Sequence, residues 1–147
     1  MNNFIKQAIE LSNESVKQDG FPAGAVIVKD NVVIAQGLSL SKTKTDVTCH
    51  AEIEAIRNAS QKLNTKDLFD CEIYTSMEPC IMCFSALYWA GIKKVVYAIG
   101  KDKLSKKYYE GLNSLSEINL KNNKQIDIMH FEELENEALS VVRDWER

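Results

Sequence analysis

Four side chains in two short segments have the types and spacing of a catalytic zinc site. His50 lies two residues before Glu52, and Cys80 lies three residues before Cys83. A catalytic zinc ion takes three protein ligands and leaves a fourth position for water, and one imidazole with two thiolates supplies those three. Glu52 is then free for acid–base work, because a carboxylate beside the activated water can take its proton and pass it to a substrate nitrogen. We therefore predict one Zn²⁺ per chain, held by His50, Cys80 and Cys83.

Both segments are expected to open helices. Pro79 suits the first position of a helix, where its missing N–H costs nothing, and it would place Cys80 and Cys83 on one face of the first turn. His50 begins a helical run that extends to about Leu63. A helix N-terminus and a metal ion both favour thiolate over thiol. Two helix starts are therefore predicted to converge on one ion.

Two other interpretations of the cysteines have to be weighed. A Cys-x-x-Cys pair can be a redox motif, but such motifs give no role to a distant His-x-Glu. A structural zinc would usually take a fourth Cys or His, and Cys49 and Cys71 are available, but neither has the paired spacing of a zinc ribbon. A buried apolar role is expected for Cys71. The complete set of residues favours a catalytic zinc over both alternatives.

The remainder of the chain is expected to alternate between helices and strands. A hairpin is predicted around Asp30–Asn31, followed by a polar loop from Ser39 to Thr48 that leads to His50. Beyond the hairpin, strand and helix alternate, so neighbouring strands should run parallel with right-handed crossovers. Residues 101–123 have no clear period and are expected to hold short helical pieces. The predicted helices are 3–16, 50–63, 79–91 and 131–147, and the predicted strands are 25–29, 32–37, 72–76, 93–98 and 125–130.

The motif His50-Ala51-Glu52 followed by Pro79-Cys80-x-x-Cys83 resembles the signature of the zinc-dependent cytidine deaminase-like superfamily. The resemblance extends from about Gly24 to Ala98 and is greatest to the guanine deaminase and tRNA adenosine deaminase branch, with Tyr88-Trp89-Ala90 favouring guanine deaminases. It implies a three-layer α/β/α cytidine deaminase-like fold of the α/β class, with a mixed five-stranded sheet. It also implies a single CMP/dCMP-type deaminase domain over residues 1–147, and a homodimer.

The same resemblance assigns residues to a substrate pocket. Ala51 would offer a backbone group to the substrate, and Trp89 would form part of the pocket wall, although a Trp on an apolar helix is equally consistent with core packing. Three positions depart from the family pattern. Ser39 stands where relatives usually carry a base-binding asparagine, Ala23 stands where guanine deaminases carry a phenylalanine, and Glu110 is the nearest match to an acidic residue that moves protons. Because a serine hydroxyl cannot make the bidentate contact of an amide, the identity of the base stays open.

Composition fits one compact cytoplasmic domain. Of the 147 residues 45% are hydrophobic and 27% are charged, and no apolar run approaches the length of a membrane span. The N-terminus lacks the charged and apolar regions of a signal peptide, so a cytoplasmic location is expected. The formal net charge of -3 argues mildly against a dedicated nucleic-acid binder, because affinity for phosphates rests on clustered Lys and Arg.

Three functions are compatible with these residues. The first is a hydrolytic deaminase that converts an exocyclic amine of a free nucleobase or nucleoside to a carbonyl, with guanine as the best candidate and cytosine or adenine as alternatives. The second is a tRNA-specific wobble adenosine deaminase, which the acidic C-terminal helix disfavours. The third is an inactive zinc-stabilised partner subunit, which the intact Glu52 disfavours. No membrane partner is expected.

Overall fold

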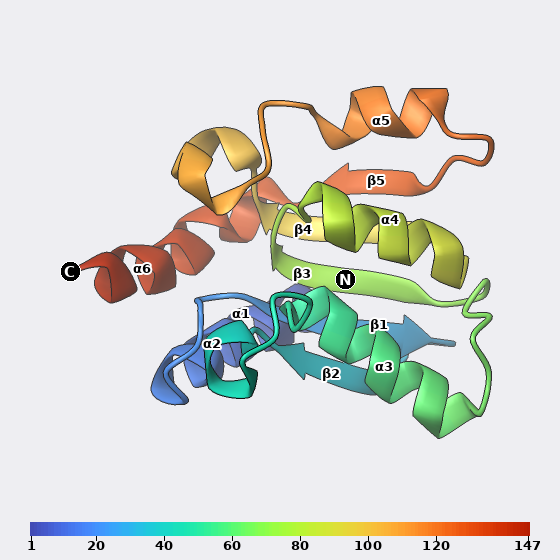
Figure 1. Ribbon diagram of the computed structural model, residues 1–147, viewed down its shortest axis with the longest axis horizontal. Helices are drawn as coiled ribbons and strands as arrows, with labels where there is room; N and C mark the ends of the chain where they lie inside the picture. Colours follow the sequence, from blue (N-terminus) through green and yellow to red (C-terminus); the bar gives the residue numbers. More distant parts are fainter.

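The computed structural model describes residues 1–147 and contains a five-stranded sheet with helices on both faces (Figure 1). The strands are β1 (Gly24–Lys29), β2 (Val32–Leu38), β3 (Glu72–Met77), β4 (Lys94–Ile99) and β5 (Asp127–His130). They lie in the order β2-β1-β3-β4-β5. Strand β1 is antiparallel to both β2 and β3, whereas β4 is parallel to both β3 and β5. The predicted α/β class with a mixed five-stranded sheet is confirmed.

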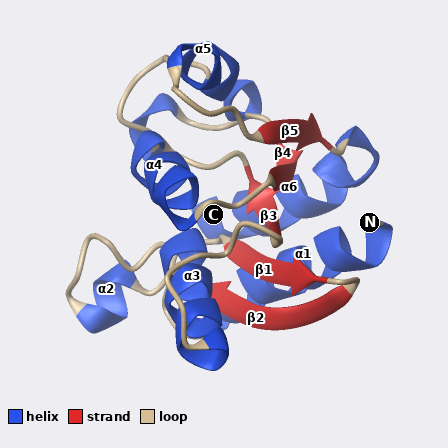
Figure 2. Ribbon diagram, turned by 90° about the vertical axis from the view of Figure 1, so that its right-hand side faces the viewer, coloured by secondary structure: helices blue, strands red, loops and turns tan.

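The helices form two layers around this sheet. They are α1 (Asn2–Lys17), α2 (Ser41–Lys44), α3 (Ala51–Leu63), α4 (Ile81–Ala90), α5 (Leu115–Lys121) and α6 (Glu135–Glu146), with 3-10 turns η1 (Lys101–Lys103), η2 (Lys106–Tyr108) and η3 (Glu132–Leu134). Figure 2 shows α1 and α6 on one face and α3 and α4 on the other. The predicted α/β/α layering is therefore confirmed. None of the helices combines the length and apolar content needed to cross a lipid bilayer.

One part of the predicted topology is wrong. The alternation of strand and helix led us to expect β2 and β3 as parallel neighbours, but β1 lies between them and pairs with each through opposite edges. The connection through α3 therefore passes over β1. The burial of the two hairpin arms explains this order, because β1 is buried almost throughout and β2 has exposed positions. A central strand must be apolar on both faces, whereas an edge strand tolerates water.

The local predictions around the hairpin largely hold. Asp30 and Asn31 have φ values of 50° and 63°, as in a type I′ turn, and the predicted hairpin is confirmed. The polar segment 39–48, predicted as a loop, contains the single helical turn α2. That turn is closed by hydrogen bonds from the N–H of Lys44 to the carbonyl of Leu40 and from the N–H of Asp46 to the carbonyl of Ser41. The segment delivers the chain to the start of α3.

Helix α3 lies so close to the sheet that only small residues fit between them. Ala51 and Ala55 are fully buried on the side of α3 that faces the sheet. Gly37 of β2 lies beneath this turn, where an added Cβ would overlap the carbonyl oxygen of Ala51 and lie 2.6 Å from the nitrogen of Ala55. Since these neighbours are helix backbone, they cannot give way as a flexible side chain would. Gly37 therefore sets how closely the start of α3 approaches the sheet.

We predict that Gly37→Ala lowers the free energy of unfolding by about 1–3 kcal/mol, the range typical of overpacking. The physical reason is the collision of the new methyl group with the α3 backbone, which pushes α3 off the sheet. Urea unfolding followed by circular dichroism measures the change. Gly111→Ala is the matched control, because a Cβ at Gly111 meets nothing within 4 Å. Equal midpoints for the two variants would contradict the close-packing argument.

Candidate active site

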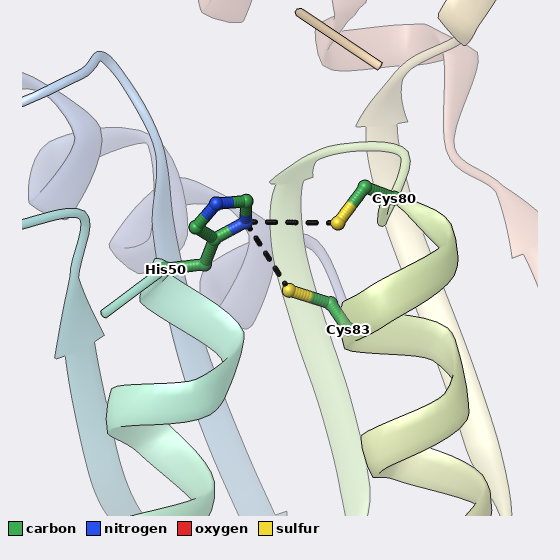
Figure 3. A group of neighbouring side chains, drawn as sticks. All are labelled: His50, Cys80 and Cys83. Carbon is green, nitrogen blue, oxygen red and sulfur yellow. Dashed lines mark hydrogen bonds between the residues drawn. The ribbon is translucent and has the colours of Figure 1, made fainter. Parts of the chain in front are cut away.

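Two helix starts converge at one end of the sheet. His50 occupies the N-cap position of α3, and Cys80 occupies the N-cap position of α4 with Cys83 in its first turn. Figure 3 shows the imidazole facing both thiols, with Nδ1 of His50 3.6 Å from Sγ of Cys80 and 3.5 Å from Sγ of Cys83. The helix begins at Ile81, so Pro79 precedes the cap and the prediction that Pro79 is the first helical residue is wrong.

The distances between these donors suit a zinc ion. Tetrahedral bonds of about 2.3 Å to sulfur and about 2.0–2.1 Å to nitrogen place the N and S donors about 3.6 Å apart. The three ligand atoms of His50, Cys80 and Cys83 lie within 4.8 Å of one another, and no other residue belongs to the group. The Sγ of Cys49 contacts Arg57, and Cys71 is fully buried elsewhere. The donor set therefore fits zinc with a fourth position left open, as a catalytic site requires.

The two thiols have opposite tendencies to ionise in the metal-free protein. A hydrogen bond from Cys83 lowers the pKa of Cys80 to about 5, against the effect of burial, and the neighbouring imidazole lowers it further. The same hydrogen bond and near-complete burial raise the pKa of Cys83. A hydrogen bond to Cys80 also raises the pKa of His50. Protons therefore compete with zinc at His50 and Cys83, because the ligand nitrogen and sulfur must be unprotonated to bind a metal.

Glu52 projects from the same turn of α3 but has a different environment. Its side chain is buried, with 5% exposure, and it lines a cavity together with His50 and Cys80. Burial raises the pKa of the Glu52 carboxyl, and the negative charge of Cys80 raises it further. A carboxyl whose pKa is raised in this way is suited to taking up and releasing a proton near neutral pH.

The cavity beside these groups has a volume of about 510 Å³, which is within the range of small-molecule sites. Its inner part contains His50, Cys80 and Glu52, and its exposed part contains Lys42 and Lys107. Its walls come from widely separated parts of the chain. The lining residues are Asp19, Gly20, Phe21, Ala23, Ser39, Ser41, Lys42, His50, Ala51, Glu52, Met77, Glu78, Cys80, Lys107, Tyr108, Tyr109 and Trp145.

Three of the residues assigned to the pocket by resemblance line this cavity, namely Ala23, Ser39 and Ala51. Ala23 and Ser39 are buried there, with 6% and 4% exposure. The hydroxyl of Ser15 bonds to both the N–H and the carbonyl oxygen of Ser39, at 3.2 and 3.0 Å, and so fixes the backbone of Ser39 beside the cavity. The small side chains at these two positions leave room that a larger asparagine and phenylalanine would fill.

The prediction that Trp89 forms part of the pocket wall is not met in this chain. Trp89 is 79% exposed, packs edge-on against Tyr88 and does not line the cavity. The reason is helical geometry. Helix α4 turns Cys83, Phe84 and Leu87 inward, which directs Trp89 to the outer side. The prediction of core packing is equally wrong.

Glu110 lies at the start of α4, next to the metal donors but outside the cavity lining. Its carboxylate accepts hydrogen bonds from the N–H groups of Ile81 and Met82, at 3.2 and 3.1 Å. Although partial burial acts in the other direction, hydrogen bonds from backbone N–H groups lower the pKa of Glu110. Glu110 thus joins the segment after β4 to the helix that carries both cysteines.

Sequence patterns missed an aromatic cluster that lines the cavity. The ring of Phe21 contacts the rings of Tyr108 and Trp145 edge-on, with centroids 5.1 and 5.2 Å apart. Tyr109 lies beside this cluster and donates a hydrogen bond to the carbonyl of Glu78 at 2.7 Å. These rings come from the loop between α1 and β1, the turns after β4 and the end of α6. No motif joins them, and the only sequence signal is the presence of aromatic residues in otherwise polar segments.

Similarity to known proteins agrees with this geometry. Residues 1–99 match the model of the cytidine and deoxycytidylate deaminase zinc-binding region. The chain belongs to this deaminase family. The guanine deaminase of Bacillus subtilis (strain 168) is 50% identical over 96 residues, which cover 65% of this chain and 62% of that protein. The tRNA-specific adenosine deaminase of Aquifex aeolicus (strain VF5) is 39% identical over 95 residues, which cover 65% of this chain and 63% of that protein.

The similarity in structure extends further along the chain. A solved structure of guanine deaminase from Nitrosomonas europaea has a TM-score of 0.87 and 27% identity, over 97% of this chain and 82% of that one. The sequence matches to the two curated deaminases span less than two thirds of those proteins. The zinc-binding region of the deaminase family ends at residue 99 and therefore excludes Tyr108, Tyr109 and Trp145, which complete the cavity.

We predict that zinc affinity rises with pH. Metal binding displaces protons from His50 and Cys83, whose pKa values are both raised in the metal-free protein, so protons compete with zinc more strongly as pH falls. The apparent affinity should change about tenfold per pH unit for each proton released. Competition with a chromogenic chelator between about pH 6 and pH 8, with correction for the chelator's own titration, measures the slope. A flat profile would contradict this ligand set.

Proposed function

We propose that this chain is a zinc-dependent aminohydrolase that deaminates a free nucleobase or nucleoside, with guanine as the first candidate. The observation that carries the proposal is the buried carboxylate of Glu52, which lines a cavity of small-molecule size beside the donors His50, Cys80 and Cys83. We further propose that residues 1–147 act as one CMP/dCMP-type deaminase domain. The cavity supports this, because it takes residues from both ends of the chain.

The proposed reaction exchanges an amine for an oxygen. Water supplies the oxygen of a new C–O bond, the C–N bond to the exocyclic amine breaks, and the products are a carbonyl and ammonia. Zinc, when held by His50, Cys80 and Cys83, lowers the pKa of water from about 15.7 to about 7 and so supplies hydroxide at neutral pH. Glu52 takes the proton released by water and donates it to a ring nitrogen, and then transfers the proton of the newly added hydroxyl group to the departing amine, which leaves the carbonyl.

The start of α3 also offers a means of orienting the substrate. Ala51 lies at the first position of this helix and lines the cavity. The first N–H groups of a helix have no partner within the helix, so they are free to bind a carbonyl oxygen of the base. The flat rings of Phe21, Tyr108 and Trp145 supply faces and edges against which a planar base can pack. The substrate is thus bound by polar groups at the buried end and by aromatic rings at the exposed end.

We propose that Glu110 helps to move protons or to position the start of α4. Its carboxylate accepts hydrogen bonds from the N–H groups of Ile81 and Met82, the two residues that follow Cys80 in the chain. Ser39 and Ala23 are proposed to shape the base pocket, in place of the larger residues typical of relatives. Guanine remains the first substrate to test because of the 50% identity to a guanine deaminase.

The second candidate function is deamination of adenosine in tRNA. The 39% identity to a tRNA-specific adenosine deaminase favours it. The charge of α6, whose Trp145 lines the cavity, disfavours it, because this helix carries Glu135, Glu137, Asp144 and Glu146 against the single Arg143. Acidic groups repel phosphates. We therefore rank a small substrate first, and an inactive zinc-stabilised partner subunit last.

We also propose a cytoplasmic homodimer. The exposed Trp89 on α4, packed against Tyr88, supports a partner surface on this helix. All four cysteines are free, as thiolate ligands in a reducing compartment need to be. Light scattering coupled to size exclusion measures the mass directly, and a monomer at micromolar concentration would contradict the dimer.

We expect Glu52→Gln to retain zinc and fold while losing at least about 100-fold in kcat, because an amide cannot carry protons. The zinc-loaded protein and the variant should be incubated with guanine, cytosine, adenine, their nucleosides and an anticodon-stem RNA, and released ammonia measured. Release from one base or nucleoside, abolished in the variant, is the expected result. Release from the RNA alone would support the second candidate, and no release with zinc retained would support the inactive subunit.

We expect Trp145→Ala to raise KM for the substrate about tenfold, as loss of a stacking face costs roughly 1–3 kcal/mol, while kcat changes by less than about twofold. KM is expected to change more than kcat because Trp145 lines the exposed part of the cavity and is not one of the metal donors. Phe69→Ala is the control, since Phe69 is a 66% exposed aromatic residue that does not line the cavity. Equal KM values for Trp145→Ala and wild type would exclude Trp145 from substrate binding.

A further inference from the structure

His50 follows a segment that has little packing of its own. Residues 43–47 are exposed, and the only regular structure in the segment is the single turn of α2. The same segment contributes Ser41 and Lys42 to the cavity. A zinc ligand at the end of such a segment needs other contacts to hold its backbone, because an exposed loop opens easily.

A buried carboxylate on α3 supplies those contacts. Glu54 is 8% exposed and lies one helical turn after His50. It accepts a hydrogen bond from Nζ of Lys44 at 2.8 Å, and its other oxygen accepts one from Nη1 of Arg57 at 2.5 Å. Against the opposing effect of burial, these hydrogen bonds lower the pKa of the Glu54 carboxyl, which is the reverse of the shift at Glu52. Glu54 is therefore an anion that ties the loop to the helix.

Arg57 carries the connection to the residues immediately before His50. Its Nη2 donates to Oγ1 of Thr48 at 2.9 Å, and its Nη1 contacts Sγ of Cys49 at 3.5 Å. The carbonyl of Thr48 in turn accepts from the N–H of His50 at 2.8 Å, and the carbonyl of His50 accepts from the N–H of Glu54 at 3.0 Å. The hydrogen bonds thus form a closed path from Glu54 through Arg57 and Thr48 to His50 and back to Glu54.

We infer that Glu54, with Arg57 and Lys44, is a positioning group that holds the His50 backbone and the adjoining cavity wall in the geometry needed for metal binding. Glu54 is not one of the metal donors, and it does not line the cavity that contains Glu52. Helix α3 packs on the sheet through Ala51 and Ala55, which lie on a different side of the helix. The hydrogen bonds of Glu54 therefore hold the loop before α3, whereas other residues attach α3 to the sheet.

Replacing Glu54 by glutamine removes the charge while keeping the shape of the side chain. Lys44 and Arg57 are then two cations without their shared anion, and they repel each other across the site that Glu54 held. Loss of groups that orient a metal ligand typically costs about 10–100-fold in metal affinity or activity. We expect Glu54→Gln to release zinc about tenfold faster than wild type.

The test measures zinc transfer from the loaded protein to an excess of chromogenic chelator, together with thermal unfolding of the metal-free protein. It uses no substrate, so its result is independent of the proposed function. Glu133→Gln is the matched control, because Glu133 is an exposed carboxylate that makes no ion pair, whereas its neighbours Glu132 and Glu135 pair with His130. The expected result is fast release from Glu54→Gln, wild-type release from Glu133→Gln, and faster hydrogen exchange in residues 41–49 of Glu54→Gln.

A second variant separates positioning from general stability. Arg57→Lys keeps the positive charge beside Glu54, but a lysine cannot reach Glu54, Thr48 and Cys49 at once, so release should be faster by about threefold. If Glu54→Gln fails to fold, Lys44→Ala replaces it, since the Lys44 side chain is 48% exposed. Wild-type zinc release in the folded variants would overturn the inference. A second outcome would also overturn it. In that outcome the metal-free variant unfolds at a lower temperature, this loss of stability accounts for all of the faster zinc release, and hydrogen exchange in residues 41–49 is unchanged.

Discussion

The structure depends on bringing two helix N-termini to one point at the end of the sheet. His50 and Cys80 cap α3 and α4, and Cys83 follows one turn later, so that three donor atoms lie within 4.8 Å of one another. Tolerances of a few tenths of an ångström at a metal require both helices to be placed accurately on the sheet. On one side the approach is set by Gly37 under α3. On the other, the N–H of Glu78 bonds to the carbonyl of Ile99 and joins the start of α4 to β4.

The two glutamates in the first turn of α3 show how environment sets the role of one residue type. Glu52 faces the cavity, where burial and a nearby thiolate raise its pKa. Glu54 faces the preceding loop, where two cations hold it ionised. In a helix of 3.6 residues per turn, side chains two positions apart point in directions that differ by about 200°. A carboxyl with a raised pKa and a fixed anion are thus placed on nearly opposite sides of one turn.

The metal donors come from the middle of the chain, whereas the cavity takes residues from near both ends. All three donors and Glu52 lie within residues 1–99, which match the zinc-binding region of the deaminase family. Tyr108, Tyr109 and Trp145 lie beyond it and line the same cavity. The donors and Glu52 are therefore encoded in the part most similar to relatives, together with most of the cavity lining, and the segment beyond residue 99 adds Lys107, Tyr108, Tyr109 and Trp145.

The sequence by itself determined the features that depend on spacing within one element. These are the hairpin turn at Asp30–Asn31, the three-residue spacing that brings Cys80 and Cys83 together at the start of α4, the apolar runs of the strands and the α/β class. Only the tertiary structure decided which distant elements meet. It placed β1 at the centre of the sheet, turned Trp89 to the outside and brought Trp145 to the cavity. The physical reason is that local hydrogen bonding and periodicity act over a few residues, whereas the neighbours of a side chain depend on how whole helices and strands pack to bury their apolar faces.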